Sequence, residues 1–251
     1  MKYVVFSDVH GNLEALERFA QRADEKGADQ MVCLGDIVGY GADPNACVEF
    51  VRDRGVPCVS GNHDDVVSGL VEPDDFNPDA RRAILWCRER ISPRNRRFLR
   101  ALEQRIVIET PRGRTLFVHG SPADKDEYIM SGWSAMKSFG LMEREDFCCA
   151  FVGHTHQPCV WVWKAGERVG LAPYSRQHSV FSISPELRLI VNVGSVGQPR
   201  DGDPEGCFVV WDDEAGSVEF VRFGYDVAKA QEKIIRANLP LFLADRLAGG
   251  Y

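Results

Sequence analysis

The chain has 251 residues, 44% of them hydrophobic and 27% charged, a balance that excludes a disordered or fibrous protein. Its net charge of −7 argues against stable nucleic-acid binding, because nucleic-acid binders usually carry a basic surface. No apolar stretch approaches the ~20 residues of a membrane span, and the first acid, Asp8, comes too early for a signal peptide. The eight cysteines form no C-x-x-C pair, so reduced structural thiols are expected. These features predict one cytoplasmic domain over residues 1–251.

The first part of the chain alternates predicted strands and helices. Short apolar runs predict buried strands at residues 3–6, 31–34 and 57–59. Apolar residues at helical spacing predict a helix over 13–23, and Asp43-Pro44 begins a second helix, because proline is tolerated in the first turn. This β-α-β-α-β order predicts parallel strands with helices packed on the faces of the sheet.

The rest of the chain combines helices with many short strands. Residues 77–102 are predicted as one or two helices broken at Ser92-Pro93, 126–145 as short helices and loops, and 227–236 as a closing helix. The predicted strands are the apolar runs at residues 105–109, 115–118, 148–152, 160–163, 179–183, 189–193, 207–211 and 218–223. Turn-forming residues such as 184–186 predict hairpins, so the second sheet should be largely antiparallel. Together these elements predict an α/β fold of two mixed sheets flanked by helices, in four layers.

Polar residues beside glycine follow five of the predicted strands. The five stretches are Asp8-Val9-His10-Gly11, Gly35-Asp36, Gly61-Asn62-His63-Asp64, His119-Gly120 and Gly153-His154-Thr155-His156. Five of the six histidines lie in these stretches, and only His178 lies elsewhere. Because ligands of open α/β sheets bind beyond the carboxyl ends of the strands, the five loops are expected to converge on one site.

Histidine and carboxylate side chains together suit transition metals such as Zn, Mn, Fe, Co or Ni. The candidate ligands are Asp8, His10, Asp36, Asn62, His119, His154 and His156. Seven ligands are too many for one tetrahedral ion, but they fit two ions that share a carboxylate. Each stretch alone has an ordinary explanation, such as a turn or, for Asp64, the cap of a following helix. Their occurrence at five successive strand ends favours a metal site.

These stretches, in this order from residue 8 to residue 156, resemble the D-x-H, G-D, G-N-H-D/E, H and G-H-x-H motifs of the calcineurin-like metallophosphoesterase superfamily. Residues 192–200 also resemble the small bacterial and archaeal branch, which includes phosphodiesterases and diadenosine-tetraphosphatase-like proteins. The fold of that superfamily is a four-layer αββα sandwich, in agreement with the predicted elements. The resemblance therefore implies a metal-dependent phosphoric ester hydrolase.

The resemblance also implies a role for each residue of the motifs. The implied ligands are Asp8, His10 and His156 for one ion, Asn62, His119 and His154 for the other, and Asp36 for both. His63 would stabilise the transition state or protonate the leaving oxygen, Asp64 would orient His63, and Asn62 would also contact the substrate. Two ions, drawn from Mn, Fe, Zn or Ni, would activate a bridging hydroxide. The substrate would be a phosphodiester or phosphomonoester, with nucleotides and dinucleoside polyphosphates among the candidates.

Two other features leave alternatives open. Arg200 lies in a turn-rich stretch, where it could clamp a phosphate or form an ion pair with Asp201 or Asp203. The segment 128–139 is rich in Met and aromatic residues. It could wall a substrate pocket, for instance by stacking on a nucleobase, or it could be core or a homodimer contact.

Two other classes of function were weighed against the hydrolase. A non-catalytic scaffold on the same fold would have little reason to keep every ligand together with His63. A nuclease would use the same site, but the acidic net charge and the lack of a basic stripe argue against a processive one. Phosphoprotein phosphatases of the superfamily carry longer inserts. We therefore expect a small phosphate-ester substrate and no membrane partner.

Overall fold

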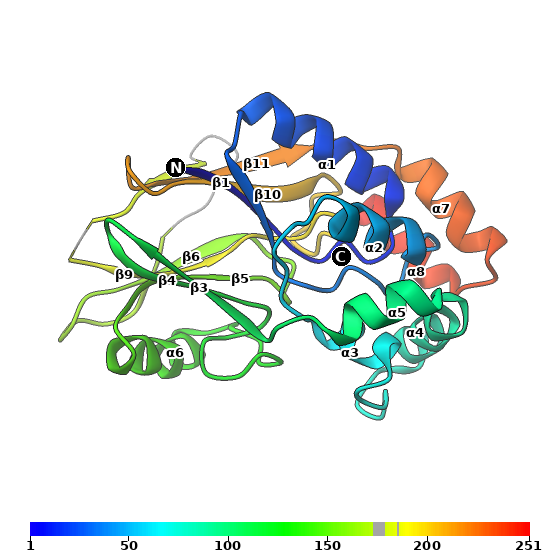
Figure 1. The fold of residues 1–251 in the computed structure, drawn as a ribbon, viewed down its shortest axis with the longest axis horizontal. Helices are drawn as coiled ribbons and strands as arrows, with labels where there is room; N and C mark the ends of the chain where they lie inside the picture. The colour runs from blue at the N-terminus through cyan, green and yellow to red at the C-terminus, as the bar shows by residue number, and fades with distance from the viewer. Residues whose placement is uncertain (173–178, 185) are drawn as a thin grey trace.

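Two mixed β-sheets lie face to face at the centre of the molecule, and helices cover their outer faces (Figure 1). The computed structural model describes residues 1–172, 179–184 and 186–251. That part of the chain contains eight helices and eleven strands. The predicted αββα sandwich with two mixed sheets is confirmed. His178 and Pro185, the middle residue of a predicted turn, lie outside the described residues.

The first sheet has the strand order β2-β1-β10-β11-β8. Its strands are β1 (Lys2–Phe6), β2 (Gln30–Cys33), β8 (Val180–Ser182), β10 (Gly206–Asp212) and β11 (Ser217–Phe223). Only β1 and β2 pair in parallel; the other described pairs of this sheet are antiparallel. The strand predicted at 57–59 is wrong, because this segment forms only isolated bridges, Cys58 to Cys33 and Val59 to Glu103.

The second sheet has the order β3-β4-β5-β9-β6-β7. Its strands are β3 (Arg105–Thr110), β4 (Gly113–Val118), β5 (Phe147–Val152), β6 (Cys159–Trp163), β7 (Gly170–Ala172) and β9 (Arg188–Asn192). β5 pairs in parallel with both β4 and β9, so this sheet is less antiparallel than expected. The hairpin predicted at 184–186 is also wrong, because β8 and β9 belong to different sheets. Turn residues serve equally well where a chain crosses between layers.

The helices cover the outer faces of the two sheets and the end at which the candidate site lies. They are α1 (Leu13–Lys26), α2 (Pro44–Asp53), α3 (Asn62–Ser68), α4 (Pro78–Arg90), α5 (Pro93–Arg100), α6 (Gly132–Arg144), α7 (Val227–Arg236) and α8 (Leu241–Gly249). The predicted break at Ser92-Pro93 separates α4 from α5. The segment expected as short helices instead contains one 13-residue helix, α6, which Ser131 caps. α8 was not predicted.

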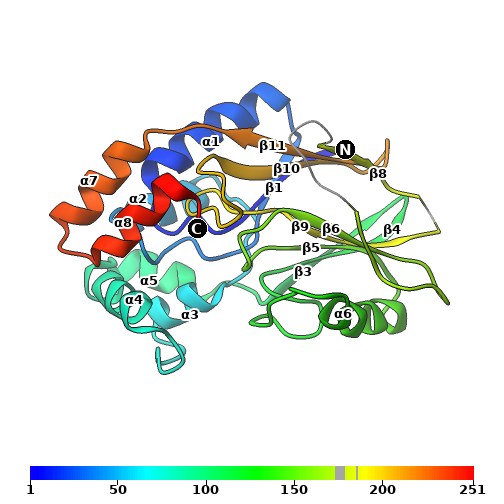
Figure 2. The same ribbon diagram turned by 180° about the vertical axis from the view of Figure 1, so that it is seen from behind.

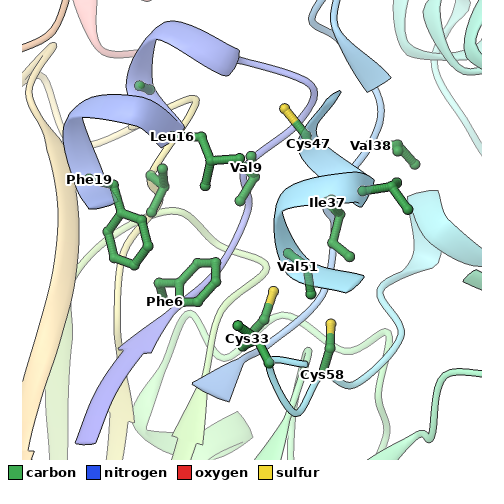
Figure 3. Close-up of a cluster of buried hydrophobic side chains, with 14 of the residues drawn as sticks. Phe6, Val9, Leu16, Phe19, Cys33, Ile37, Val38, Cys47, Val51 and Cys58 are labelled. Atoms are coloured by element: carbon green, nitrogen blue, oxygen red, sulfur yellow. The ribbon is translucent and has the colours of Figure 1, made fainter. Parts of the chain in front are cut away.

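Each central strand buries both faces, because helices cover one side and the other sheet covers the opposite side. In β1, Val4 and Phe6 pack with the helices, while Tyr3 and Val5 face the second sheet. Figure 3 shows the helix side of this arrangement, where Leu16 and Phe19 of α1 lie over Phe6. The described cysteines are all free thiols, and no helix in the described residues is both long and apolar enough to span a membrane.

Candidate metal centre

The candidate ligands follow strands of both sheets and meet at one end of the sandwich. Asp8 and His10 follow β1 and Asp36 follows β2, so these three come from the first sheet. His119 follows β4, and His154 and His156 follow β5, so these three come from the second sheet. Asn62 is the first residue of α3. All are buried except Asn62, which is half-buried.

Asp8, His10 and His156 form the first cluster. The Nε2 atom of His156 lies 3.1 Å from Oδ1 of Asp8 and 3.2 Å from Nε2 of His10. Nε2 of His10 lies 3.6 Å from the same Asp8 oxygen. Neighbouring ligand atoms around one ion at about 2.1 Å are about 3.0–3.4 Å apart, so the spacing suits a single transition-metal ion.

Asp36, His119 and His154 form the second cluster. Nε2 of His119 lies 3.0 Å from Nδ1 of His154 and 3.4 Å from Oδ2 of Asp36. The same Asp36 oxygen lies 3.7 Å from Nε2 of His10 in the first cluster. Asp36 is therefore adjacent to both clusters through one oxygen atom.

The second ring nitrogen of each of these four histidines faces a backbone carbonyl. The pairs are His10 Nδ1 with Val38 O at 3.1 Å, His119 Nδ1 with Leu34 O at 2.8 Å, His156 Nδ1 with Gln198 O at 2.6 Å, and His154 Nε2 with Asp126 O at 3.0 Å. A carbonyl only accepts hydrogen bonds, so each of these nitrogens carries the proton. In the neutral rings the nitrogens that face the clusters therefore present lone pairs.

The clusters consist of acceptor atoms that face one another. Oδ1 of Asp8, Oδ2 of Asp36 and Oδ1 of Asn62 are buried without a hydrogen-bond partner among the described residues. The other oxygen of each carboxylate is held by backbone, because His154 N donates to Asp8 Oδ2 at 3.0 Å and His63 N donates to Asp36 Oδ1 at 2.9 Å. Buried acceptors without donors are costly, and a bound cation removes that cost. The residues present thus fit metal ions.

The carboxylates and histidines of the two clusters act on each other's pKa values. Burial would raise the pKa of both Asp8 and Asp36, but the neighbouring histidines outweigh it and hold both pKa values below the usual range. Burial would lower the pKa of His119, but Asp36 outweighs it and raises that pKa to about 10. Burial lowers the pKa of His154 to about 4 and that of His156 to about 3. The carboxylates stay ionised, and their buried negative charge calls for cations.

The backbone at the site is held in an unusual conformation. Of the non-glycine residues with positive φ in the described part of the chain, five are candidate ligands: Asp8, His10, Asp36, His154 and His156. Such values are uncommon for residues with a side chain and persist only where the surroundings impose them. A side chain at Gly61 would overlap Oδ1 of Asp36, and one at Gly153 would overlap the Ser7 hydroxyl, so both positions require glycine.

His63 lies beside both clusters. A ring nitrogen of His63 lies within 4.8 Å of ligand atoms of His10 and Asp36, and its ring centroid is 4.8 Å from that of His10. The ring also packs against Tyr40 and Phe76, at centroid distances of 4.6 and 4.9 Å. Burial lowers the pKa of His63 well below its usual value, so the ring is neutral near pH 7.

Asp64 acts on the backbone rather than on the His63 ring. Its Oδ1 accepts from Ile37 N at 3.0 Å, and its Oδ2 accepts from Gly61 N at 3.1 Å. Asp64 is the third residue of α3, from which a short carboxylate reaches back to the first free N–H group of the helix. The implied contact with His63 is therefore replaced by a cap that fixes the loops carrying Asp36 and Asn62. Burial raises the pKa of Asp64 to about 8.

Arg200 does not form the ion pair that its acidic neighbours suggested. Asp201 pairs with Arg222. The Arg200 side chain donates through Nη2 to Oε1 of Gln198 at 2.8 Å, and its guanidinium lies 5.6 Å from the centroid of the Tyr40 ring. Since Tyr40 contacts His10 at 4.6 Å, Arg200 lies close to the first cluster.

A cleft of about 370 Å³ opens beside the second cluster. Its lining includes Asn62, His63 and His154 together with the rings of Tyr40, Phe76 and Tyr128. Tyr128 stacks on His154 at a centroid distance of 3.9 Å. Tyr128 thus lines this cleft, whereas Phe139 of α6 is buried in the core, as one of the alternatives for this segment expected. Trp133 is 80% exposed on α6.

The segment after β9 supports the ligand loops, and most of its contacts have no signal in the sequence. Nδ2 of Asn192 donates to Gly153 O at 2.6 Å, and the Ser195 hydroxyl donates to Asp8 O at 2.8 Å. Gln198 provides the carbonyl that orients His156. Sequence reasoning assigned no role to these residues or to Tyr40. The resemblance of residues 192–200 to the family branch was the one available indication.

Comparisons with known proteins agree with this geometry. A family model described as the calcineurin-like phosphoesterase superfamily domain matches residues 1–215. The chain is 36% identical over 247 residues to uncharacterized protein MJ0912 of Methanocaldococcus jannaschii, with 97% of this chain and 96% of that protein covered. It is also 36% identical to a metallophosphoesterase from Sphaerobacter thermophilus of known structure, with a TM-score of 0.83 and coverage of 100% and 99%. The hypothetical protein PH1004 from Pyrococcus horikoshii OT3 shares the fold, with a TM-score of 0.81 at 18% identity and coverage of 100% and 98%. The chain therefore belongs to the calcineurin-like phosphoesterase superfamily.

Proposed function

We propose that the protein is a dinuclear metal-dependent phosphoesterase that hydrolyses a small phosphodiester or phosphomonoester. The observation that carries this proposal is the convergence of buried ligand atoms, in which ring nitrogens of four oriented histidines face two carboxylate oxygens that have no hydrogen-bond partner among the described residues. Asp8, His10 and His156 would hold one ion, and Asn62, His119 and His154 would hold the other. Asp36 would be the shared ligand, a role supported by its Oδ2 atom being 3.7 Å from His10 and 3.4 Å from His119.

When bound, two such ions supply Lewis acidity and lower the pKa of a contacting water, which makes a nucleophile available at neutral pH. The protein contributes rigid placement. The carbonyls of Val38, Leu34, Gln198 and Asp126 fix the tautomer and rotation of the four imidazoles. The phosphorus would thus meet a site whose ligands need little reorganisation.

His63 is the residue placed to act on the substrate. It lines the cleft between Tyr40 and Phe76, beside both clusters but outside the four oriented histidines. A neutral imidazole there can donate a hydrogen bond to a phosphate oxygen or to the leaving oxygen. His63 would therefore stabilise the transition state, and Asp64 would hold the loop from which it projects.

The cleft would bind the organic group of the ester. Its volume of about 370 Å³ is in the range of small-molecule sites. The rings of Tyr40, Phe76 and Tyr128 provide flat apolar contacts, which suit an aromatic group such as a nucleobase. Lys125 at the rim is already paired with Asp65 at 2.6 Å and with Asp126 at 3.0 Å. The cleft is therefore better matched to an uncharged group than to a chain of phosphates.

Hydrolysis of bis(p-nitrophenyl) phosphate and of p-nitrophenyl phosphate tests the proposal. The protein would be stripped of metal and assayed after addition of Mn, Ni, Zn or Mg. Activity that returns with a metal supports the enzyme, and the preferred ester distinguishes a diesterase from a monoesterase. Two bound ions without activity on either ester, or on a panel of nucleotides and dinucleoside polyphosphates, would favour a scaffold instead.

A further inference from the structure

Arg200 lies beside the first cluster with unused hydrogen-bonding capacity. Its backbone N–H donates to the carbonyl of the ligand His156 at 3.3 Å, so the residue is fixed to the metal centre. Among the described residues its side chain donates one hydrogen bond, to Oε1 of Gln198, and its Nε atom is buried with no acceptor there. Arginine presents five donors in a planar fork, so most of the recognition capacity of Arg200 is free.

Arg246 reaches the same region from α8. The end of α8 is docked on the loop that carries Arg200, because Gly202 N donates to Gly250 O at 2.8 Å (Figure 2). Nε of Arg246 donates to the main-chain oxygen of Tyr251, the last residue of the sequence, and its guanidinium lies 5.1 Å from the Phe242 ring centroid. Within the described residues no Asp or Glu side chain forms an ion pair with Arg200 or Arg246.

The positive charge of Arg200 acts on Arg246 across this contact between the end of α8 and the Arg200 loop. Burial, followed by the positive charge of Arg200, lowers the pKa of Arg246 to about 10, so Arg246 remains charged at pH 7. The charge of Arg200 also acts on Tyr40 and Tyr128, which line the cleft. Two divalent ions would bring four positive charges to two carboxylates, Asp8 and Asp36. The metal-loaded centre and the two arginines would then carry more positive charge than one phosphate group neutralises.

We propose that Arg200 and Arg246 bind a second phosphate group of the substrate, next to the phosphate held at the metal centre. This inference rests on the proposed function and narrows its substrate to molecules with two phosphates, either adjacent, as in a nucleoside polyphosphate, or separate, as in a nucleoside bisphosphate. Arginine forks match phosphate oxygens with paired charge-assisted hydrogen bonds. Among the residues lining the cleft, the cation is Lys125, which two carboxylates already engage, so the second phosphate is directed to the arginines.

Arg246 lies in the C-terminal helices, which pack against α1 and α4. In this proposal they add a recognition residue to the site that the preceding residues assemble.

Calorimetric binding to the metal-loaded protein tests the inference with three ligands. AMP carries one phosphate, the methylene-bridged analogue of ADP carries two adjacent phosphates, and adenosine 3′,5′-bisphosphate carries two separate ones. We expect one of the two bisphosphorylated ligands to bind about 10-fold or more tightly than AMP, the gain typical of charge-assisted hydrogen bonds. The bisphosphorylated ligand that binds more tightly than AMP shows whether the two phosphates of the substrate are adjacent or separate.

Variants show whether the arginines cause the gain. Arg246→Ala should reduce the ratio of the Kd for AMP to the Kd for the preferred bisphosphorylated ligand to near one. Arg246→Lys should keep part of this preference, because lysine retains the charge but lacks the planar fork of donors. Arg94→Ala is the matched control, since Arg94 is 72% exposed and lies 3.9 Å from Asp53 on the surface. A preference that survives in both Arg200→Ala and Arg246→Ala, or no preference in the wild type, would overturn the inference.

The same samples would be assayed for hydrolysis of bis(p-nitrophenyl) phosphate, which carries no second phosphate. Active protein without a preference for bisphosphorylated ligands means that the arginine site is wrong while the phosphoesterase stands. Inactive protein with an Arg246-dependent preference means that the anion site is correct and the proposed reaction is wrong. The two proposals therefore fail separately.

Discussion

His10 and His156 face each other through their Nε2 atoms at 3.2 Å, while the Nδ1 atom of each ring faces a backbone carbonyl. In the neutral rings no proton lies between the two facing nitrogens, so their lone pairs oppose each other. The arrangement is unfavourable without a cation and favourable with one. The stability of the surrounding fold offsets this cost and holds both residues at positive φ.

Removal of metal should therefore destabilise the folded protein. We expect protein treated with a chelator to melt below the metal-loaded protein, because the ion binds only the folded arrangement of ligands. At a free ion concentration of 100 times Kd the gain is about 2.7 kcal/mol, which corresponds to about 5–10 °C for a chain of this size. Differential scanning calorimetry measures the shift. The variant His156→Ala should show a smaller metal-dependent gain, and equal melting of the stripped and loaded wild type would contradict the expectation.

Changing His63→Ala should reduce turnover without loss of metal. His63 lies beside the clusters and lines the cleft, and general acid–base or hydrogen-bonding groups in such positions contribute about 10²–10⁴-fold. Metal analysis should still find about two ions per chain, as in the wild type. A large loss of bound metal in this variant would instead identify His63 as a ligand.

Changing Asp36→Asn should disturb both ions at once. The substitution keeps an oxygen for the His63 backbone N–H, but it replaces the charged oxygen that faces His10 and His119. We expect metal content to fall toward zero, whereas His154→Ala should lose mainly the ion of the second cluster. Titration with Mn followed by metal analysis separates the two patterns. Retention of one tightly bound ion in Asp36→Asn would show that the carboxylate is not shared.

Changing Tyr128→Ala should weaken binding of aromatic esters. Tyr128 stacks on His154 and lines the cleft, and an aromatic contact is worth about 0.5–1.5 kcal/mol, or about 2–10-fold in KM. Trp133→Ala is the control, because Trp133 is an aromatic residue on α6 outside the cleft lining. Steady-state kinetics with bis(p-nitrophenyl) phosphate distinguish the two variants. Equal effects on KM would remove the cleft from the substrate site.

Changing Lys233→Met should lower stability in a pH-dependent way. Lys233 of α7 lies 2.7 Å from Glu14 of α1 and 2.8 Å from Asp43 before α2. Burial opposes ionisation of Glu14, but Lys233 and Lys229 outweigh it and hold the pKa of Glu14 below its usual value. Such a carboxylate stabilises the fold above its unfolded pKa, and the contribution is lost as pH falls through the folded pKa.

The variant should therefore be less stable than the wild type at pH 7, by about 0.5–3 kcal/mol. The difference should shrink as the pH falls below the unfolded pKa of Glu14 and then through its lower folded pKa, where Glu14 becomes protonated in both folded and unfolded chains. Urea unfolding at pH 7 and over an acidic pH series measures this difference in the free energy of unfolding. Lys137→Met serves as a control on a surface pair with Glu127, and a difference that grows on acidification would contradict the assignment.

The positions of the candidate ligands could be predicted because strand ends converge and because Asp and His are recognisable as metal ligands by residue type. The atoms that orient these ligands could not be predicted. Val38, Leu34 and Gln198 act through backbone carbonyls, which every residue possesses. The same limit explains Asp64, whose role depends on its being the third residue of α3 rather than on its neighbour His63.

Fold errors arose where local signals do not determine partners. Residues 57–59 are apolar, like a buried strand, but they form only bridges to residues 33 and 103. The turn residues at 184–186 mark a change of direction without stating which sheet receives the next strand. Arg246 lies 46 positions after Arg200, so only the folded chain shows that the end of α8 contacts the loop that carries Arg200.

Each candidate ion draws its ligands from both sheets. In the first cluster, Asp8 and His10 follow β1 while His156 follows β5, and in the second, Asp36 follows β2 while His119 follows β4. Two ions would therefore cross-link the two sheets at one end of the sandwich. Sliding or separation of the sheets would then require breaking metal–ligand bonds. Substrate and product would then pass through the cleft, whose lining comes largely from loops and helices outside the two sheets.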